Sequence, residues 1–162
     1  MNETATVERV FIAPEAEAPM DELDAVETVA GRGLRGDRYF QERETGTFVT
    51  WESGERPSGY DLTLIEREAV EAVERDAGIS LAPGEHRRNL ETRNVALNHL
   101  VGERFRVGEV VCRGVRLCEP CSHLQRITED GVLDAFVHRG GLRADVVDGG
   151  TIRVDDEIVV LD

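Results

Sequence analysis

Two cysteines and a histidine, Cys118, Cys121 and His123, lie close together in the second half of the chain. Residues 110–117, just before them, have the apolar character of a β-strand, and the polar residues 122–129 that follow are compatible with a helix. Only the thiolate form of cysteine acts as a nucleophile or a metal ligand, so the surroundings of these thiols decide their chemistry. The spacing therefore predicts a thiol held at the end of a strand, where a ligand can reach it.

Of the three cysteines in the chain, we expect Cys121 to be the reactive one. Pro120 fixes the backbone that leads into it, and a helix starting at Ser122 would place its sulfur near a helix N-terminus. That end of a helix stabilises an anion and lowers the pKa of a thiol. Cys118 is then a less reactive neighbour or a resolving thiol, and Cys112, within an apolar strand pattern, is expected to be buried and inert.

Arginines form two groups that could bind an anion. Arg87 and Arg88 precede Asn89, and this combination suits a phosphate or another oxyanion. Neighbours in a strand point to opposite faces, so only one of the two arginines should face a ligand. The glycine-rich segment 31–39 holds the second group, which is either one wall of an anion pocket or a solvated turn; its arginines are Arg32, Arg35 and Arg38.

The composition excludes several functions. Acidic residues outnumber basic ones by 33 to 19, which gives a net charge of −14, and every basic residue is arginine. An acidic surface disfavours nucleic acid, which requires a basic face. Without lysine, the chain cannot hold pyridoxal phosphate as a Schiff base. The dispersed acidic residues are compatible with an ordinary acidic protein, but together with the absence of lysine they favour a cytosolic protein from a halophile, in which high salt screens their mutual repulsion.

This charge predicts a strong dependence of stability on salt. The melting temperature should rise steeply as KCl goes from tens of millimolar to molar concentrations, because the Debye length falls to about 3 Å at 1 M. Thermal melts at a series of KCl concentrations measure this effect. A flat profile would remove the argument for a halophilic protein.

The remaining pattern predicts one domain over residues 1–162, mainly β with a few peripheral helices. The expected strands are 7–13, 26–30, 48–51, 61–65, 88–92, 104–107, 109–117, 144–147 and 151–161. Helical spacing covers 66–77, with Thr63 and Glu66 as a capping box, and recurs at 131–138; 95–101 forms a helical turn. A hairpin turn is expected at 148–150. No apolar run is long enough to cross a membrane and the N-terminus is polar, so we expect a cytoplasmic location.

Several motifs together resemble a stand-alone MOSC domain, the module found at the C-terminus of molybdenum-cofactor sulfurases. The resemblance covers nearly the whole chain and depends on the order and spacing of segments 33–39, 62–66, 87–90, 100–108, 118–124 and 149–152. It implies a β-barrel fold and a site for the pyranopterin molybdenum cofactor. One departure from the family pattern is Asn94, where glycine is common, although asparagine tolerates the same left-handed backbone.

The resemblance also implies roles for individual residues. Cys121 corresponds to the family's sulfur carrier or molybdenum ligand, and Cys118 has no such role in most of the family. The first candidates for contact with the cofactor are Arg87, Arg88 and Asn89. Weaker candidates are Arg35, Asp37 and Arg38 of the glycine-rich motif and His123 of segment 118–124, which we call the cysteine segment.

Three functions are compatible with these residues. In the first, the chain is a molybdoenzyme that reduces N-hydroxylated compounds, with Cys121 as the molybdenum ligand and a separate protein as electron donor. In the second, it is a sulfur carrier or cofactor-delivery module that uses a persulfide on Cys121. In the third, Cys118, Cys121 and His123 bind a structural zinc ion together with another cysteine or histidine, although a single pair of cysteines is a weak zinc signal.

Overall fold

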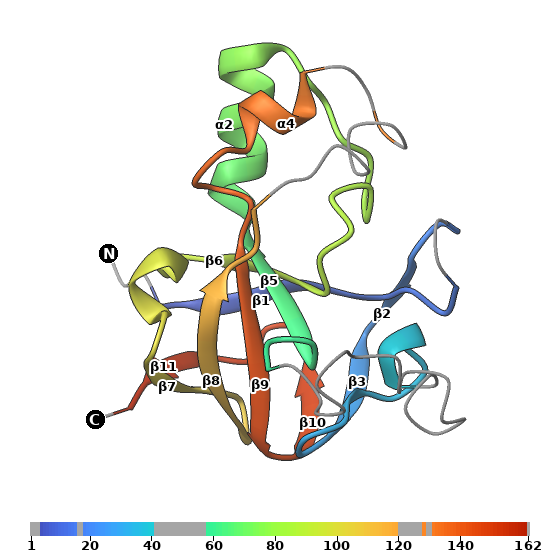
Figure 1. Cartoon of the computed structure of the whole chain (residues 1–162), viewed down its shortest axis with the longest axis vertical. Helices are drawn as coiled ribbons and strands as arrows, with labels where there is room; N and C mark the ends of the chain where they lie inside the picture. Colours follow the sequence, from blue (N-terminus) through green and yellow to red (C-terminus); the bar gives the residue numbers. More distant parts are fainter. Residues whose placement is uncertain (1–3, 16–17, 41–57, 120–127, 129–130, 162) are drawn as a thin grey trace.

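The structure is a computed structural model that describes residues 4–15, 18–40, 58–119, 128 and 131–161 (Figure 1). Within these residues the chain is mainly β, as the sequence predicts. The strand expected at 48–51 lies outside the described residues, and so do Cys121 and His123. No helix in the described ranges is long and apolar enough to cross a membrane.

Eight strands form the main sheet, which curls back on itself. Its strands, in spatial order, are β11 (Ile158–Val160), β7 (Arg104–Val107), β8 (Val110–Leu117), β9 (Leu142–Asp148), β5 (Leu62–Glu66), β6 (Leu90–Arg93), β1 (Thr6–Ile12) and β2 (Asp21–Leu23). A bridge between Thr6 and Glu157 connects β1 to the residue before β11. The amide of Ile158 also donates to the carbonyl of Ala5 at 2.8 Å. The predicted barrel therefore takes the form of a curled sheet joined along this seam.

A second sheet of three strands packs against the same core. It consists of β10 (Gly150–Arg153), β3 (Ala25–Val29) and β4 (Gly33–Leu34), in that order. The hairpin predicted at 148–150 is wrong, because β9 and β10 do not pair and these residues carry the chain from one sheet to the other. A Cβ on Gly149 would lie 2.7 Å from the carbonyl oxygen of Thr28, so the glycine permits the close approach of β3.

The core lies inside the curled sheet and contains side chains from both sheets. Alternation of exposed and buried residues along β7 points Phe105 and Val107 inward, where they meet Cys112 of β8 and Ile152 of β10. Cys112 is fully buried, as expected, and burial raises the pKa of its thiol to about 12. A thiol that stays protonated in this way is a poor nucleophile.

Helices α2 (Arg67–Ala77) and α4 (Val132–Ala135) lie together at one end of the main sheet (Figure 1). Helix α2 (Arg67–Ala77) confirms the helix predicted there, and Gly78 ends it in the left-handed conformation. The predicted capping box is wrong: Glu66 occupies the N-cap position without a side-chain cap, because Thr63 lies within β5. Asn94 has a φ of 63°, the left-handed backbone expected where the family has glycine.

A second, smaller core joins these helices. Predicted helix 131–138 is shorter in the structure, as α4 (Val132–Ala135), because the backbone leaves helical geometry at Phe136, whose φ is −98° and ψ 6°. The predicted turn at 95–101 is a 3-10 helix, η1 (Leu97–Leu100). Val132 and Phe136 pack against residues of α2 and its flanks, namely Ile65, Val70, Val73 and Ile79. This core fixes the position at which the chain re-enters the described structure after the cysteine segment.

Candidate functional site

The main chain at Cys118 is held on both sides where it leaves strand β8. Its amide donates to the carbonyl of Gly141 at 2.8 Å, and its own carbonyl accepts a hydrogen bond from Arg88 at 3.1 Å. The next residue, Glu119, accepts the backbone amide of His138 at 2.9 Å. The side chain of Cys118 is only 3 % exposed. The cysteine segment therefore starts from a fixed point, and its first thiol faces the protein interior.

Gly141 permits this attachment. Its φ is +114°, and a Cβ there would lie 2.0 Å from the carbonyl oxygen of Leu64 in β5. Only glycine tolerates both the backbone angle and the contact. Strand β9 can therefore begin close against β5 while the carbonyl of Gly141 remains directed at Cys118.

Arg88 is a buried clamp between three segments of main chain. Its side chain is directed inward, and the residue is 8 % exposed. Nε donates to the carbonyl of Gly140 at 2.8 Å, Nη1 to that of His86 at 3.2 Å and Nη2 to that of Cys118 at 3.1 Å. Each nitrogen of the guanidinium group therefore already has a backbone acceptor. These contacts give Arg88 a structural role, and the phosphate contact that the sequence suggested stays a prediction.

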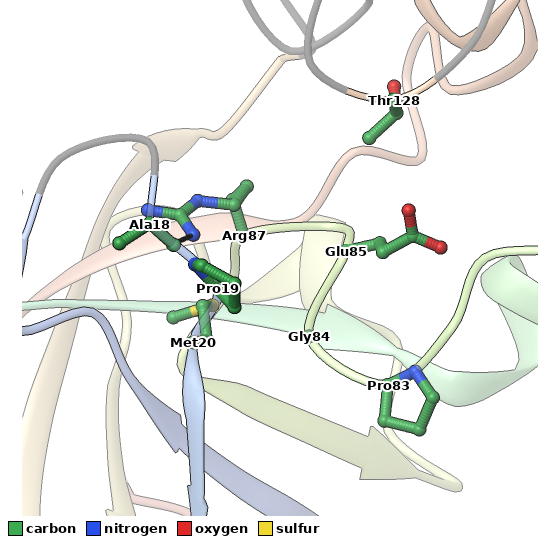
Figure 2. Close-up of a pocket in the computed structure, with 8 residues that line it drawn as sticks. All are labelled: Ala18, Pro19, Met20, Pro83, Gly84, Glu85, Arg87 and Thr128. Atoms are coloured by element: carbon green, nitrogen blue, oxygen red, sulfur yellow. Dashed lines mark hydrogen bonds between the residues drawn. The ribbon is translucent and has the colours of Figure 1, made fainter.

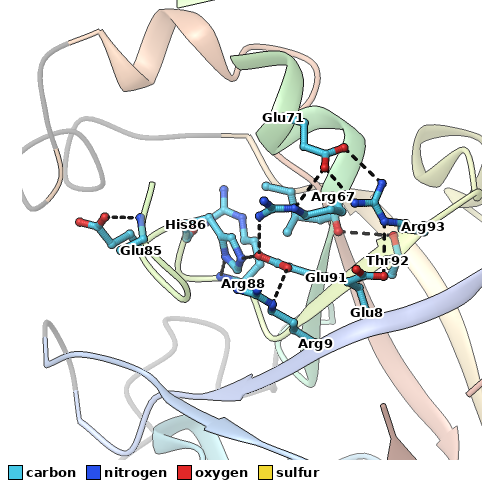
Figure 3. A network of polar contacts seen from close by, with 12 residues as sticks. Glu8, Arg9, Arg67, Glu71, Glu85, His86, Arg88, Glu91, Thr92 and Arg93 are labelled. Carbon is cyan, nitrogen blue, oxygen red and sulfur yellow. Dashed lines mark hydrogen bonds and ion pairs between the residues drawn. The ribbon is translucent and has the colours of Figure 1, made fainter. Parts of the chain in front are cut away.

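His86 and Glu91 form a buried pair next to Arg88 (Figure 3). The Nδ1 atom of His86 accepts the backbone N–H of Arg88 at 2.9 Å, so the ring carries its proton on Nε2. Nε2 lies 2.9 Å from Oε1 of Glu91 and donates to it. Burial lowers the pKa of His86, which keeps the ring neutral as this geometry requires.

Glu91 is ionised beside this neutral ring. Burial alone would raise its pKa, but the hydrogen bond from His86 and the guanidinium groups of Arg67 and Arg9 outweigh that effect and lower it. Arg67 lies 3.7 Å from Oε1, and Arg9 lies 3.9 Å from Oε2 (Figure 3). The network therefore connects β1, β6 and α2 to the loop that carries Arg88. The sequence draws attention to His86, which directly precedes the Arg87-Arg88-Asn89 stretch, but it does not indicate the pairing with Glu91.

The His86–Glu91 pair predicts that acid destabilises the protein. The pKa of His86 in the folded state lies below its ordinary value of 6.5, so the unfolded chain binds the proton more readily. Stability should be complete above pH 6.5 and should decline as the pH falls from there toward the folded-state pKa. Protonation of Glu91 adds to the loss below its ordinary value of 4.5.

Thermal melts of the wild type and His86→Gln between pH 5 and 7.5 test this. The variant should have a lower melting temperature at pH 7.5 and a flatter decline toward pH 5, since glutamine does not titrate. Parallel pH profiles in the two proteins would contradict the assignment.

Arg87 lines a pocket of about 170 Å³ (Figure 2). The strand expected at 88–92 begins only at Leu90, and Arg87 has a left-handed φ of 65°. Its guanidinium group donates to the carbonyl of Ala18, and Thr128 lies across the pocket. The remaining lining comes from Pro19, Met20, Pro83, Gly84 and Glu85. Of the two adjacent arginines, Arg87 is the one that lines this pocket.

Asn89 and Asp37 are occupied by main-chain contacts. The amide oxygen of Asn89 accepts the N–H of Thr63 at 2.9 Å, and its nitrogen donates to the carbonyl of Phe11 at 3.1 Å. Asp37 accepts the N–H of Ala13 at 2.9 Å and that of Tyr39 at 3.3 Å. Burial raises the pKa of Asp37. Both residues therefore fix the glycine-rich segment against β1 and β5.

Arginines and tyrosines gather on the outer side of β8 and β9, in what we call the arginine–tyrosine cluster: Arg38, Tyr39, Tyr60, Arg116 and Arg143. Arg116 and Arg143 lie 5.5 and 5.0 Å from the ring centre of Tyr60. Arg38 lies 4.2 Å from that of Tyr39. The two rings meet edge to face, with centres 5.6 Å apart. These flat cationic and aromatic groups suit a planar, anionic ligand.

Strand pairing places Arg116 and Arg143 of this cluster close to Cys118, the first residue of the cysteine segment. Arg116 pairs with Arg143 across β8 and β9, and Leu117 pairs with Leu142. The next step along both strands is the hydrogen bond between Cys118 and Gly141. At about 3.3 Å per residue, the arginines stand about 7 Å along the strands from that point. Arg116 and Arg143 form no ion pair with any carboxylate in the ranges that the structure covers.

The glycine-rich motif contributes unequally to this cluster. Arg38 belongs to it, whereas Arg35 is directed elsewhere, pairing with Glu27 at 3.2 Å and lying 5.2 Å from the ring centre of Phe40. Cys121 and His123 lie outside the described residues. Among the residues that are described, no group of three histidine, cysteine or acidic side chains could hold a metal ion.

The sequence of residues 58–159 matches the MOSC domain family, and the chain belongs to that family. The fold is similar to that of the YuaD protein from Bacillus subtilis, with a TM-score of 0.76, 19 % identity, and coverage of 97 % of this chain and 95 % of that one. YiiM from Geobacillus stearothermophilus is also similar, with a TM-score of 0.70, 11 % identity, and coverage of 98 % and 75 %. YiiM from Escherichia coli has a TM-score of 0.64, 18 % identity, and coverage of 100 % and 70 %. None of the curated proteins matches the chain in sequence.

Proposed function

We propose that this chain binds the pyranopterin molybdenum cofactor and uses it to reduce N-hydroxylated compounds, with Cys121 as the ligand to the metal. MOSC domains are associated with molybdenum-cofactor sulfurase-like proteins, and membership of this family gives the proposal its starting point. The observation that carries it is the arginine–tyrosine cluster, which lies beside the fixed start of the cysteine segment.

The cluster fits the chemistry of this cofactor. A pterin is planar and its side chain ends in a phosphate, so the cofactor needs both a flat surface and cationic donors. Tyr60 provides a ring, and Arg116 and Arg143 provide guanidinium groups on adjacent strands. In a protein with a net charge of −14, such a group of arginines is a favourable local place for an anion.

The cofactor would supply a two-electron redox centre, and a soft thiolate is a suitable ligand for a transition metal of this kind. In the overall reaction, the N–O bond of the substrate breaks, the oxygen leaves as water, and the nitrogen is left as an amine or a related reduced group. The electron pair would come from a separate donor protein, and the protons from solvent. In this scheme the segment that carries Cys121 is fixed where it starts, at Cys118 and Glu119, by the contacts with Arg88, Gly141 and His138.

The pocket beside Arg87 is our candidate for substrate entry. Its volume of about 170 Å³ suits a small molecule or part of a larger one, and it lies between the loop of Arg87 and Thr128, which follows the cysteine segment in the chain. Its lining combines apolar groups, such as Pro19 and Met20, with the polar groups of Glu85 and Arg87 (Figure 2).

Reconstitution tests the proposal. Cofactor-free protein is mixed with molybdenum cofactor released from a donor molybdoenzyme, passed through a sizing column, and assayed with a chemical reductant and an N-hydroxylated amidine. We expect pterin fluorescence to elute with the protein and the amidine to be formed. Elution of the pterin with the protein but without reduction would favour the carrier function. Failure of the pterin to bind, with zinc retained instead, would overturn the proposal.

A further inference from the structure

We infer that His86 and Glu91 are positioning residues for the cysteine segment, and that they act on it through Arg88. The contacts themselves are independent of any cofactor; only the purpose of the positioned segment rests on the proposed function. Both residues are buried, at 2 % and 1 % exposure, and neither lines the pocket beside Arg87. A titratable pair so far inside the protein costs desolvation energy, which its contacts must offset.

The contacts form a continuous series from β6 to Cys118. Glu91 accepts the Nε2–H of His86 at 2.9 Å, which orients the ring and fixes its tautomer. With that tautomer fixed, Nδ1 is an acceptor, and it receives the backbone N–H of Arg88 at 2.9 Å. The guanidinium group of Arg88 then donates to the carbonyl of Cys118 at 3.1 Å.

Each step depends on the one before it. If Glu91 were lost, the ring could turn or adopt the other tautomer, in which Nδ1 carries a proton and repels the amide of Arg88. The backbone at Arg88 follows Arg87, whose left-handed φ of 65° is unfavourable for a residue with a side chain. The hydrogen bond to His86 therefore holds the amide of Arg88 between two neighbours that are also bonded, since the amide of Arg87 donates to the carbonyl of Gly84 and that of Asn89 to the carbonyl of Thr63. The position of the Arg88 guanidinium group follows from this backbone.

Arg88 holds the main chain at two points, Cys118 and Gly140, through one side chain. The carbonyl of Cys118 lies at its start, and that of Gly140 lies just before β9, next to the Gly141 carbonyl that receives the amide of Cys118. The same guanidinium group thus ties the exit of β8 to the entry of β9. Loss of its alignment should loosen the main chain at Cys118 before it affects distant strands such as β7 and β11.

Local hydrogen–deuterium exchange in the cofactor-free protein tests this inference. His86→Gln places an amide near Nε2 and removes the acceptor for Arg88, whereas His86→Asn places an amide oxygen near Nδ1 and keeps it. Glu91→Leu removes the acceptor for the ring, and Glu91→Gln keeps one. Arg75→Gln, which removes a charge from an exposed arginine of α2, is the control for charge.

In His86→Gln and Glu91→Leu, we expect exchange of the amides around Cys118 and Gly141 to rise at least about fivefold, comparable to the loss of one hydrogen bond. The rate at which iodoacetamide alkylates Cys121 should change in the same variants. His86→Asn, Glu91→Gln and Arg75→Gln should stay closer to the wild type in both measurements. Strands β7 and β11 should keep wild-type exchange throughout.

Exchange that rises equally in all strands would overturn the inference, because it would show a general loss of stability. The inference would also be overturned if the amide of Cys118 exchanged at the wild-type rate in His86→Gln. If Glu91→Leu does not fold, the comparison of exchange in His86→Gln and His86→Asn decides whether the inference holds. The result does not depend on cofactor binding, so a failure of the proposed function in reconstitution would leave this test intact.

Discussion

Cys121→Ser is expected to abolish retention of molybdenum while leaving the fold intact. Serine removes the soft ligand but has nearly the same size, and its hydroxyl does not ionise at neutral pH. Cys118→Ser is the matched control, because its main chain is fixed by Arg88 and Gly141 and its thiol is buried. The Cys118→Ser substitution should reduce the retention of molybdenum only in part.

Metal content after gel filtration, together with the melting temperature of each variant, measures the effect. A structural zinc site makes the opposite prediction, since both substitutions would then release the metal and destabilise the protein. The order of thiol reactivity is a second check. If Cys118 is alkylated faster than Cys121 in the folded protein, the assignment of the functional cysteine is wrong.

Arg143→Gln is expected to weaken cofactor binding by about 1.5–3 kcal/mol, or roughly 10- to 150-fold, the range for a hydrogen bond to a charged group. Arg143 is placed beside Tyr60 and Arg116 and has no acidic partner among the described residues, so its removal should change binding more than folding. Arg113→Gln is the control, since this exposed arginine lies on β8 but outside the cluster.

Titration of the cofactor-free variants with pterin fluorescence as the signal measures this difference. Arg116→Gln should behave like Arg143→Gln, because the two residues are paired across β8 and β9. Equal affinities for Arg143→Gln and Arg113→Gln would exclude the cluster as the phosphate site. A loss confined to Arg87→Gln would move that site to the neighbouring pocket.

Local patterns in the sequence predicted most strands and the long helix, because those signals depend on residues near one another. Alternation in 104–107 and the apolar stripe of 67–77 are examples, and both elements are present as β7 and α2. The turn at 148–150 shows the limit of such reasoning. Asp148-Gly149-Gly150 has the composition of a hairpin, but close packing against β3 directs the chain into another sheet.

The candidate site was predicted only in part, for a similar reason. The stretch Arg87-Arg88-Asn89 stood out by composition, and in the described part of the chain Arg88 and Asn89 bind main chain while Arg87 lines the pocket beside Ala18. Arg116 and Arg143 are 27 positions apart in the sequence and become neighbours through strand pairing. The tautomer of His86 likewise depends on Glu91, which only the fold brings close enough to bond it.

The most direct test of the account is the molybdenum and pterin content of protein purified from cells fed molybdate. Elemental analysis and the fluorescence of the oxidised pterin should detect both in equal amounts, in stoichiometric ratio to the chain. The same preparation from a host that cannot make the cofactor should contain neither and should still fold. Zinc without pterin in both preparations would contradict the account, because Cys121 would then belong to a structural metal site.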